Sequence, residues 1–156
     1  KITLTLNKIV LGIEKCLYLG NLYSLRDWGH ARDYAEMQWK ILQQKKPDDY
    51  VIATEKQYSV KFFVEECLKY LGIKIKWEGK GLSEKGLIIF FNKTKYPKLK
   101  IGQVIVRVDK KYIRPLDVKN LIGNAKKARK ILGWKSKTSI KKLISEMMES
   151  DSKILS

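Results

Sequence analysis

The hydrophobic pattern of the chain changes repeatedly between helical and strand spacing. Apolar residues fall at helical spacing near 2–15, 30–44 and 59–71, and short apolar runs typical of strands lie between them at 17–19 and 50–53. Each helix has one apolar stripe and must bury it against another element, and the intervening strands supply a sheet. The sequence therefore predicts an α/β fold.

The second half of the chain continues this alternation. Residues 73–77 alternate with period two, 104–108 are a further apolar run, and helical spacing returns near 124–132 and 138–149. A Gly- and Lys-rich segment at about 79–102 is predicted to be an excursion of loop and hairpin. The chain thus ends with two helices after its last predicted strand.

Several residues have the chemistry of helix caps. Ser59 is a predicted N-cap for the helix near 59–71, and Gly72 is its predicted C-terminal stop. Thr138 is the predicted N-cap of the last helix. That helix is expected to turn four apolar side chains inward: Leu143, Ile144, Met147 and Met148.

Length and composition indicate one domain over residues 1–156, because a chain of 156 residues with 44% hydrophobic residues can bury one ordinary core. No apolar run approaches the roughly 20 residues of a membrane helix. Cys16 and Cys67 have no CxxC partner, so reduced thiols are expected. We therefore expect a cytoplasmic protein without a membrane partner.

The first residue is Lys, and helical spacing begins at once with Ile2, Leu6 and Ile9. No cap or turn signal precedes this pattern. We therefore expect that sequence upstream of Lys1 has been lost or removed.

The net charge of +17 arises from 33 basic and 16 acidic residues, which raises the possibility of a polyanionic partner. The lysines are spread over predicted helices, turns and termini rather than clustered, so we do not expect nucleic acid to be the partner. A basic nucleic-acid-binding domain is kept as the less favoured alternative, and it requires a single basic face in the folded chain.

Two arginines have the chemistry of an anion site. Arg26 lies at a predicted junction of loop and helix, and Pro115 favours an extended conformation at Arg114. A guanidinium presents a planar fork of donors that matches phosphate oxygens. The alternative for Arg26 is a surface ion pair with Asp27. Taken alone, an Arg-Asp or an Arg-Pro dipeptide is a weak signal of an anion site.

Other chemistries find little support in the sequence. His30 is the only histidine, which excludes a metal site of several histidines, and it is interpreted as a helix-start residue. There is no Gly-rich dinucleotide motif and no Walker A motif. Tyr70 and Lys74 have Tyr-x-x-x-Lys spacing but straddle Gly72 at a helix end, so we assign no catalytic residue and no metal site. The sequence has four tryptophans: Trp28, Trp39, Trp77 and Trp134. Three of the four lie on elements that need a core, so they are predicted to be mostly core residues.

Several collinear blocks resemble one known family, the GDP-mannose 4,6-dehydratases. The most specific is the string RDWGHA, which begins at Arg26. The similarity covers nearly the whole chain in order, through Leu17–Leu22, Ser24–Tyr34, Tyr50–Thr54, Tyr58–Val60, Tyr112–Pro115 and Leu132–Lys135.

The resemblance implies the C-terminal substrate-binding domain of an extended short-chain dehydrogenase, lacking most of the N-terminal Rossmann domain. It implies a lyase that converts GDP-mannose to GDP-4-dehydro-6-deoxymannose and water, by oxidation at C4, loss of water across C5–C6 and return of the hydride to C6. NADP would be the cofactor, bound mainly by the absent domain, and the full-length enzyme would be a homo-oligomer. The family's catalytic groups would precede Lys1, so this chain alone is expected to be inactive.

The resemblance also implies five substrate-binding residues. Lys1 matches the Lys at the start of the family's substrate-contacting helix, and Arg26 matches the Arg that grips the pyrophosphate. Arg114 matches a second substrate Arg, with Tyr112 beside it. Asp117 stands where family members often have Glu, and it would accept a hydrogen bond from a sugar or ribose hydroxyl.

The chain departs from the family pattern at a few loop positions. Asn124 and Ala125 replace a common Asp-Pro, and Ser136 replaces a common Pro. These changes affect loop geometry and remove no binding group. A sugar-nucleotide-binding remnant without catalysis is the nearest alternative, and the sequence upstream of Lys1 distinguishes it from a truncated enzyme.

Overall fold

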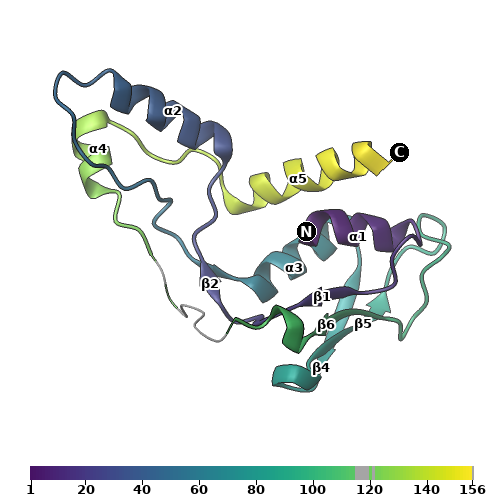
Figure 1. Cartoon of the computed structure of the whole chain (residues 1–156). Coiled ribbons are helices and arrows are strands. Elements are labelled where there is room, and N and C mark those ends of the chain that lie inside the picture. Colours follow the sequence, from purple (N-terminus) through teal and green to yellow (C-terminus); the bar gives the residue numbers. More distant parts are fainter. Residues whose placement is uncertain (115–119, 121, 156) are drawn as a thin grey trace.

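Helices pack on one face of a sheet in the α/β arrangement that the sequence predicts (Figure 1). The computed structural model describes residues 1–114, 120 and 122–155. None of the helices in these ranges is both long and apolar enough to cross a bilayer.

The sheet has four strands in the order β1-β6-β5-β4. β1 (Leu17–Leu19) is parallel to β6 (Val104–Val108), with Leu17 opposite Val106. β5 (Lys85–Phe90) is antiparallel to β6 on one side and to β4 (Lys74–Glu78) on the other. The sheet is therefore mixed, and its single parallel pair lies at the β1 edge.

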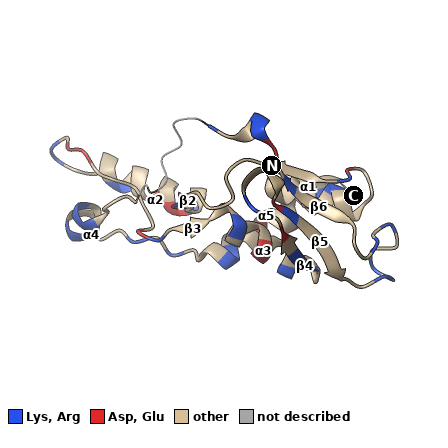
Figure 2. Cartoon of the chain, turned by 90° about the horizontal axis from the view of Figure 1, so that it is seen from below, with Lys and Arg blue, Asp and Glu red and all other residues tan. Residues whose placement is uncertain are grey.

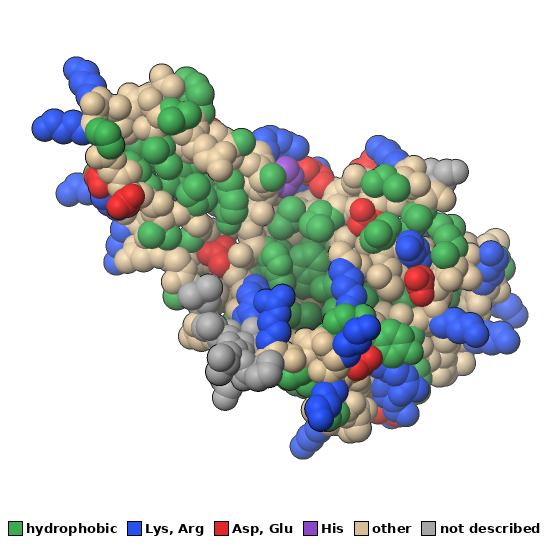
Figure 3. Space-filling view, in the orientation of Figure 1, with side chains coloured by type: hydrophobic (Ala, Val, Ile, Leu, Met, Phe, Trp, Pro, Cys, Tyr) green, Lys and Arg blue, Asp and Glu red, His purple; other side chains and the backbone are tan. Residues whose placement is uncertain are grey.

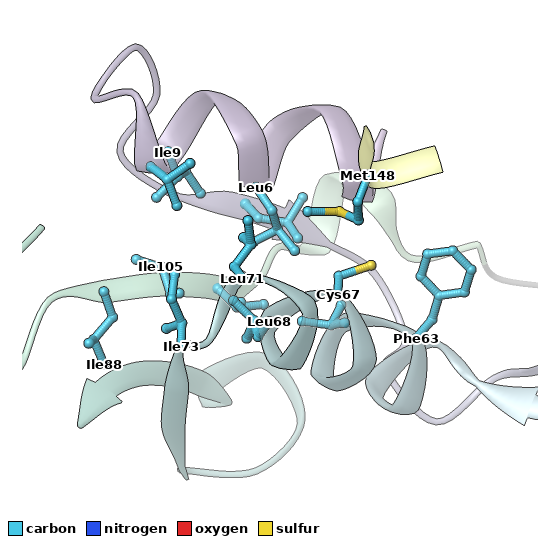
Figure 4. Packing of buried hydrophobic residues seen from close by; sticks show 14 of the residues in the cluster. Leu6, Ile9, Phe63, Cys67, Leu68, Leu71, Ile73, Ile88, Ile105 and Met148 are labelled. Atoms are coloured by element: carbon cyan, nitrogen blue, oxygen red, sulfur yellow. The ribbon is translucent and has the colours of Figure 1, made fainter. Parts of the chain in front are cut away.

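Two helices, α1 (Ile2–Val10) and α3 (Val60–Leu71), lie on one face of this sheet, and α5 (Ile140–Leu155) packs against both of them (Figure 1). Their apolar stripes meet the inward side chains of the strands in one continuous core. Burial of a Leu- or Ile-sized side chain contributes about 1.5–3 kcal/mol each. Figure 4 shows this core, with Leu6 and Ile9 from α1, Phe63, Cys67, Leu68 and Leu71 from α3, Ile73, Ile88 and Ile105 from the sheet side, and Met148 from α5. We call this sheet with its three helices the main lobe.

The buried amide of Asn7 joins two of these helices. Its Nδ2 group donates to the carbonyl oxygen of Thr3 at 3.2 Å in α1 and to that of Met148 at 3.0 Å in α5. A buried polar group is tolerated only when it is hydrogen-bonded, so these two bonds fix one arrangement of the helices.

Helix α3 begins and ends as its sequence predicts. The Ser59 hydroxyl oxygen accepts a hydrogen bond from the Phe62 N–H at 3.0 Å, which satisfies one donor of the first turn. Gly72 closes the helix with φ 73°, a left-handed conformation that costs glycine little. Both predicted caps are confirmed.

A smaller part of the molecule, which we call the second lobe, contains α2 (Ala31–Leu42), α4 (Lys126–Leu132) and the extended segment 50–53. It lies beside the main lobe at the left of Figure 1. Trp134 is its largest buried side chain, and its Nε1–H donates to the carbonyl oxygen of Asp33 at 2.9 Å. The other members of this smaller core are Met37, Ala53, Ala125, Ala128 and Leu132.

The segment 50–53, predicted to be a strand, has no strand pairing with any described residue, and that prediction is wrong for this chain. Its backbone has no neighbouring strand here, and the side chain of Val51 is half-exposed. An antiparallel pair of two residues on each strand forms instead between β2 (Leu25–Arg26) and β3 (Tyr58–Ser59), which the sequence analysis missed.

The segment 79–102 contains an inner strand of the sheet. β5 lies there and pairs with β4 in a hairpin, and a loop leads from it to β6. A short 3-10 helix (Gly81–Ser83) makes the turn of this hairpin. The segment therefore contains a loop and half of a hairpin, as predicted, and it belongs to the main lobe because β5 pairs with β4 on one side and with β6 on the other.

Three predictions about single residues are corrected. α5 begins at Ile140, and the Ser139 hydroxyl oxygen rather than that of Thr138 accepts the N–H of Lys142 at 3.3 Å. The Thr138 N–H donates to Asp33 Oδ2 at 2.8 Å instead. Met147 is 38% exposed and Trp39 is 62% exposed, because each lies on the outer side of its helix.

Candidate functional site

A cavity of about 300 Å³ lies where β1 and β6 end. These strands are parallel, so their carboxyl ends meet at one edge of the sheet, the place where open α/β sheets commonly bind ligands. The segment after β1 and the segment after β6 form two of its walls, and the start of α1 and Val60 complete it. We call this the strand-end cavity. It is lined by Lys1, Ile2, Leu19, Gly20, Asn21, Ser24, Arg26, Val60, Tyr112 and Arg114.

Gly20 allows the two walls to approach each other. A Cβ atom at this position would lie 2.2 Å from the carbonyl oxygen of Tyr112, closer than any side chain can come. The Asp109 N–H donates to the carbonyl oxygen of Leu19 at 2.8 Å and ties the same walls together. The short 3-10 helix η2 (Lys110–Tyr112) then brings Tyr112 to the cavity.

The side chains of Lys1 and Tyr112 are in direct contact. The Lys1 ammonium group lies 3.3 Å from the centroid of the Tyr112 ring, within the range of a cation–π interaction. This contact links the start of α1 to the segment after β6. The family resemblance implied that both are substrate-binding residues, although they are far apart in the sequence.

Arg26 reaches the cavity from β2. Its Nη1 group donates to the carbonyl oxygen of Leu25 at 2.7 Å, and its backbone lies opposite Tyr58 in β3. The neighbouring Asp27 accepts hydrogen bonds from the N–H and hydroxyl groups of Thr54 and from the Glu55 N–H. Asp27 therefore holds the turn at residues 54–55, where Glu55 has a φ of 62°.

A buried ion pair supports the loop that leads from β1 to β2. Glu84, whose side chain is 2% exposed, accepts hydrogen bonds from the Tyr23 hydroxyl and the Lys61 ammonium, both at 2.8 Å. Burial alone would lower the pKa of Lys61, but its bonds with Glu84 and Tyr23 hold that pKa above its ordinary value. The Lys61 N–H donates to the carbonyl oxygen of Leu22 at 2.8 Å, so this loop has little freedom to move.

The strand-end cavity thus gathers four of the five predicted binding residues: Lys1, Arg26, Tyr112 and Arg114. The fifth, Asp117, lies outside the described residues. Three of the four carry a positive charge, and no described residue of the lining is acidic. This is an arrangement that favours an anion with several oxygens, such as a phosphate group.

The sequence analysis missed several residues of the lining. Gly20 and Asn21 follow a strand directly, which is a common place for a ligand-binding turn, and this signal could have identified them. The Asn21 Oδ1 atom accepts the Tyr23 N–H at 2.9 Å and shapes that turn. Ser24 and Val60 have no comparable signal, because they reach the cavity only through the pairing of β2 with β3.

His30 has the structural role that its sequence position indicates. Its Nδ1 atom accepts the Arg32 N–H at 3.0 Å, which caps α2, and its Nε2 atom lies 3.0 Å from a carboxylate oxygen of Glu146 in α5. The described residues contain no group of three or more His, Cys, Asp or Glu side chains arranged to hold a metal ion.

Comparison with solved structures identifies the fold. A structure described as RMD from Pseudomonas aeruginosa complexed with NADPH superposes with a TM-score of 0.70 at 11% identity, over 98% of this chain and 41% of that one. A dTDP-glucose 4,6-dehydratase from Bacillus anthracis in complex with NAD superposes with a TM-score of 0.67 at 18% identity, over 97% of this chain and 39% of that one. The chain has the α/β fold of the extended short-chain dehydrogenases over part of their length.

Comparison of sequences identifies the family. The family model described as GDP-mannose 4,6 dehydratase matches residues 1–147. A GDP-mannose 4,6-dehydratase from Vibrio cholerae is 47% identical over 154 residues, which are 99% of this chain and 41% of that protein. The chain spans about two fifths of the length of the curated relatives it matches. It belongs to the GDP-mannose 4,6-dehydratase family.

Proposed function

We propose that this chain is the sugar-nucleotide-binding part of a GDP-mannose 4,6-dehydratase and that its strand-end cavity holds the diphosphate of GDP-mannose. The complete enzyme would convert GDP-mannose to GDP-4-dehydro-6-deoxymannose and water. The family and the position of the cavity at the carboxyl ends of two parallel strands both support this proposal.

The observation that carries the proposal is the meeting of Lys1, Arg26, Tyr112 and Arg114 in one cavity. A diphosphate carries negative charge on oxygens that point in several directions, and two guanidinium groups from separate segments can bind them from different sides. The role of Asp117 as an acceptor for a sugar or ribose hydroxyl stays a prediction.

The strand-end cavity offers no second site for NADP. The sequence has no Gly-rich strand–turn–helix motif, and a cavity of about 300 Å³ is at the small end for even one drug-sized ligand. We assign the cofactor to residues outside this chain.

Titration calorimetry of GDP-mannose against Arg26 variants tests the proposal. Arg26→Ala should weaken binding by about 1.5–3 kcal/mol, the range for hydrogen bonds to charged groups. Arg26→Lys should recover only part of the loss, because an ammonium group restores the charge without the planar fork. Lys45→Ala removes an exposed positive charge beyond the end of α2 and serves as the matched control, which should bind as the unaltered chain does.

Unchanged affinity in Arg26→Ala would exclude Arg26 from the binding site. An equal loss in Lys45→Ala would show that net charge, rather than the cavity, determines affinity. Circular dichroism and the unfolding midpoint of each variant establish that the fold is retained.

The nucleic-acid alternative finds no support in the distribution of charge. Figure 2 shows Lys and Arg on both lobes and along the length of the chain, and on the face seen in Figure 3 their side chains are spread over both lobes, with Asp and Glu among them. A nucleic-acid-binding domain would instead gather its positive charge on one face or along one helix.

A further inference from the structure

A second cavity, of about 720 Å³, lies on the main lobe away from the strand-end cavity. It is formed by the segment that follows α1, by β1 and β6, and by the loop that precedes β6. These two connecting segments lie side by side at the right of Figure 1. We call it the basic cavity, and it shares no lining residue with the strand-end cavity. Its lining includes Lys15, Cys16, Tyr18, Lys98, Lys100 and Arg107.

Positive charge predominates in this cavity. Four cationic side chains line it, from Lys15, Lys98, Lys100 and Arg107, and Glu14 is the single acidic residue of its described lining. Bringing cations together in a folded chain costs free energy unless an anion lies among them. The lining therefore has the composition of an anion site.

Arg107 is the best-placed cation of this cavity. In the parallel pairing of β1 with β6 it lies opposite Tyr18, and in the antiparallel pairing with β5 it lies opposite Lys85. Like charges directly opposite each other destabilise a sheet. Lys85 lies 3.7 Å from a carboxylate oxygen of Glu78, whereas no carboxylate of a described residue lies within 4.0 Å of Arg107.

The thiol beside Arg107 does not neutralise it. Burial raises the pKa of Cys16 to about 11, and the positive charge of Arg107 offsets only part of this effect. The thiol is therefore protonated and uncharged at neutral pH.

One wall of the basic cavity is fixed by a hydrogen bond between its two connecting segments. The Lys98 ammonium donates to the carbonyl oxygen of Leu11 at 2.9 Å, just beyond the end of α1. The same ammonium has two further N–H groups for a ligand. Lys98 thus holds the two connecting segments together from an exposed position of the lining.

Size and an aromatic ring indicate the class of ligand. A cavity of about 720 Å³ is within the range of small-molecule sites, and Tyr18, which is 43% exposed, offers a ring face next to Arg107. We propose that the basic cavity binds the phosphate groups of a small phosphorylated molecule and stacks that molecule's ring on Tyr18. This would be a second anion site, separate from the one proposed for GDP-mannose.

Titration calorimetry of the purified chain with ATP and with inorganic tripolyphosphate tests this proposal. The double variant Lys15→Gln/Arg107→Gln should bind both probes about tenfold more weakly or worse, since two charge-assisted contacts are lost. Lys45→Gln/Lys46→Gln removes two exposed charges elsewhere and should bind as the unaltered chain does. Tyr18→Leu should weaken the binding of ATP and leave that of tripolyphosphate unchanged.

Equal affinities in the two double variants would overturn the proposal. Each titration is carried out with GDP-mannose in saturating excess, so that the strand-end cavity is occupied and the remaining heat reports on the basic cavity. Loss of tripolyphosphate binding under this condition would assign the anion to the strand-end cavity instead. A short single-stranded oligonucleotide is the third probe. If it binds and neither ATP nor tripolyphosphate does, the partner is a polymer and the proposal is wrong.

Discussion

A methyl group on Gly20 would lie 2.2 Å from the carbonyl oxygen of Tyr112, and this contact defines a test at the scale of one residue. Gly20→Ala should force the segment after β6 away from β1 and move Tyr112 out of position. We expect the affinity for GDP-mannose to fall by about 1–2 kcal/mol, because the binding groups no longer converge. Calorimetry measures this loss.

The control for this test is Gly102→Ala, where an added methyl group meets no atom within 4 Å and the cost is confined to the left-handed backbone, with φ 79°, away from the strand-end cavity. It is expected to leave the affinity for GDP-mannose unchanged. If Gly20→Ala also binds with full affinity, the approach of the two walls has no part in binding.

Asp33 gives a prediction for pH dependence. Burial alone would raise the pKa of its carboxyl group, but hydrogen bonds from Thr138, Lys137 and Ser136 hold that pKa below its ordinary value. A depressed pKa in the folded state stabilises the fold above the ordinary Asp pKa of about 3.9, and this stabilisation disappears as the pH falls through the lower value.

Asp33→Asn should therefore lower the free energy of unfolding at pH 7 by about 1–3 kcal/mol, since the acceptor of several hydrogen bonds is lost. The difference from the unaltered chain should narrow as the pH is reduced from about 5 towards 2. Urea unfolding at several pH values measures both effects. Asp49→Asn, on an exposed loop, is the control, and a pH-independent difference for Asp33→Asn would contradict this account.

At the scale of one element, α3 is the helix whose limits the sequence predicted best. Ser59→Ala removes the side-chain acceptor of the Phe62 N–H and should lower the free energy of unfolding by about 1 kcal/mol. Ser152→Ala, at an exposed position within α5, should leave stability unchanged or raise it slightly, because Ala has the higher helix propensity. Chemical unfolding of both variants checks the comparison, and equal effects would show that Ser59 does not act as a cap.

The elements that were predicted correctly are those that local sequence determines. The strand at 17–19 and the helix that ends at Gly72 have apolar spacing and caps within their own residues. The segment 50–53 has the same local preference for a strand, yet a strand also needs a partner, and no described strand lies beside it. The pairing of β2 with β3 was missed because two residues on each side carry no periodic pattern.

The candidate site was predictable only in part, for a related reason. Arg26 and Arg114 were identified from their chemistry and from the family resemblance, and the structure brings both to the strand-end cavity. Their meeting depends on the parallel pairing of β1 with β6, which local sequence does not encode. Val60 could not be predicted as a lining residue, because an apolar residue at the start of a helix has no chemistry that distinguishes a binding residue from a core residue.

At the scale of the whole molecule, the chain should bind GDP-mannose without converting it. We propose that the catalytic groups lie outside these residues, and the chain spans about two fifths of the length of its relatives. Calorimetry should detect binding, while product analysis after incubation with GDP-mannose and NADP should detect no GDP-4-dehydro-6-deoxymannose. Turnover by the purified chain would contradict this assignment of roles.

The parallel pair of β1 and β6 also has a consequence for the order in which the chain folds. β4 and β5 are close in sequence and can form their hairpin early, whereas Leu17 must find Val106 across most of the main lobe's sequence. Closing so long a loop costs entropy before any contact compensates it, so distant pairs tend to form late. During refolding, amide protons of the hairpin should become protected from exchange before those of β1. The chain would acquire the ability to bind a ligand at the strand ends only in its last folding step.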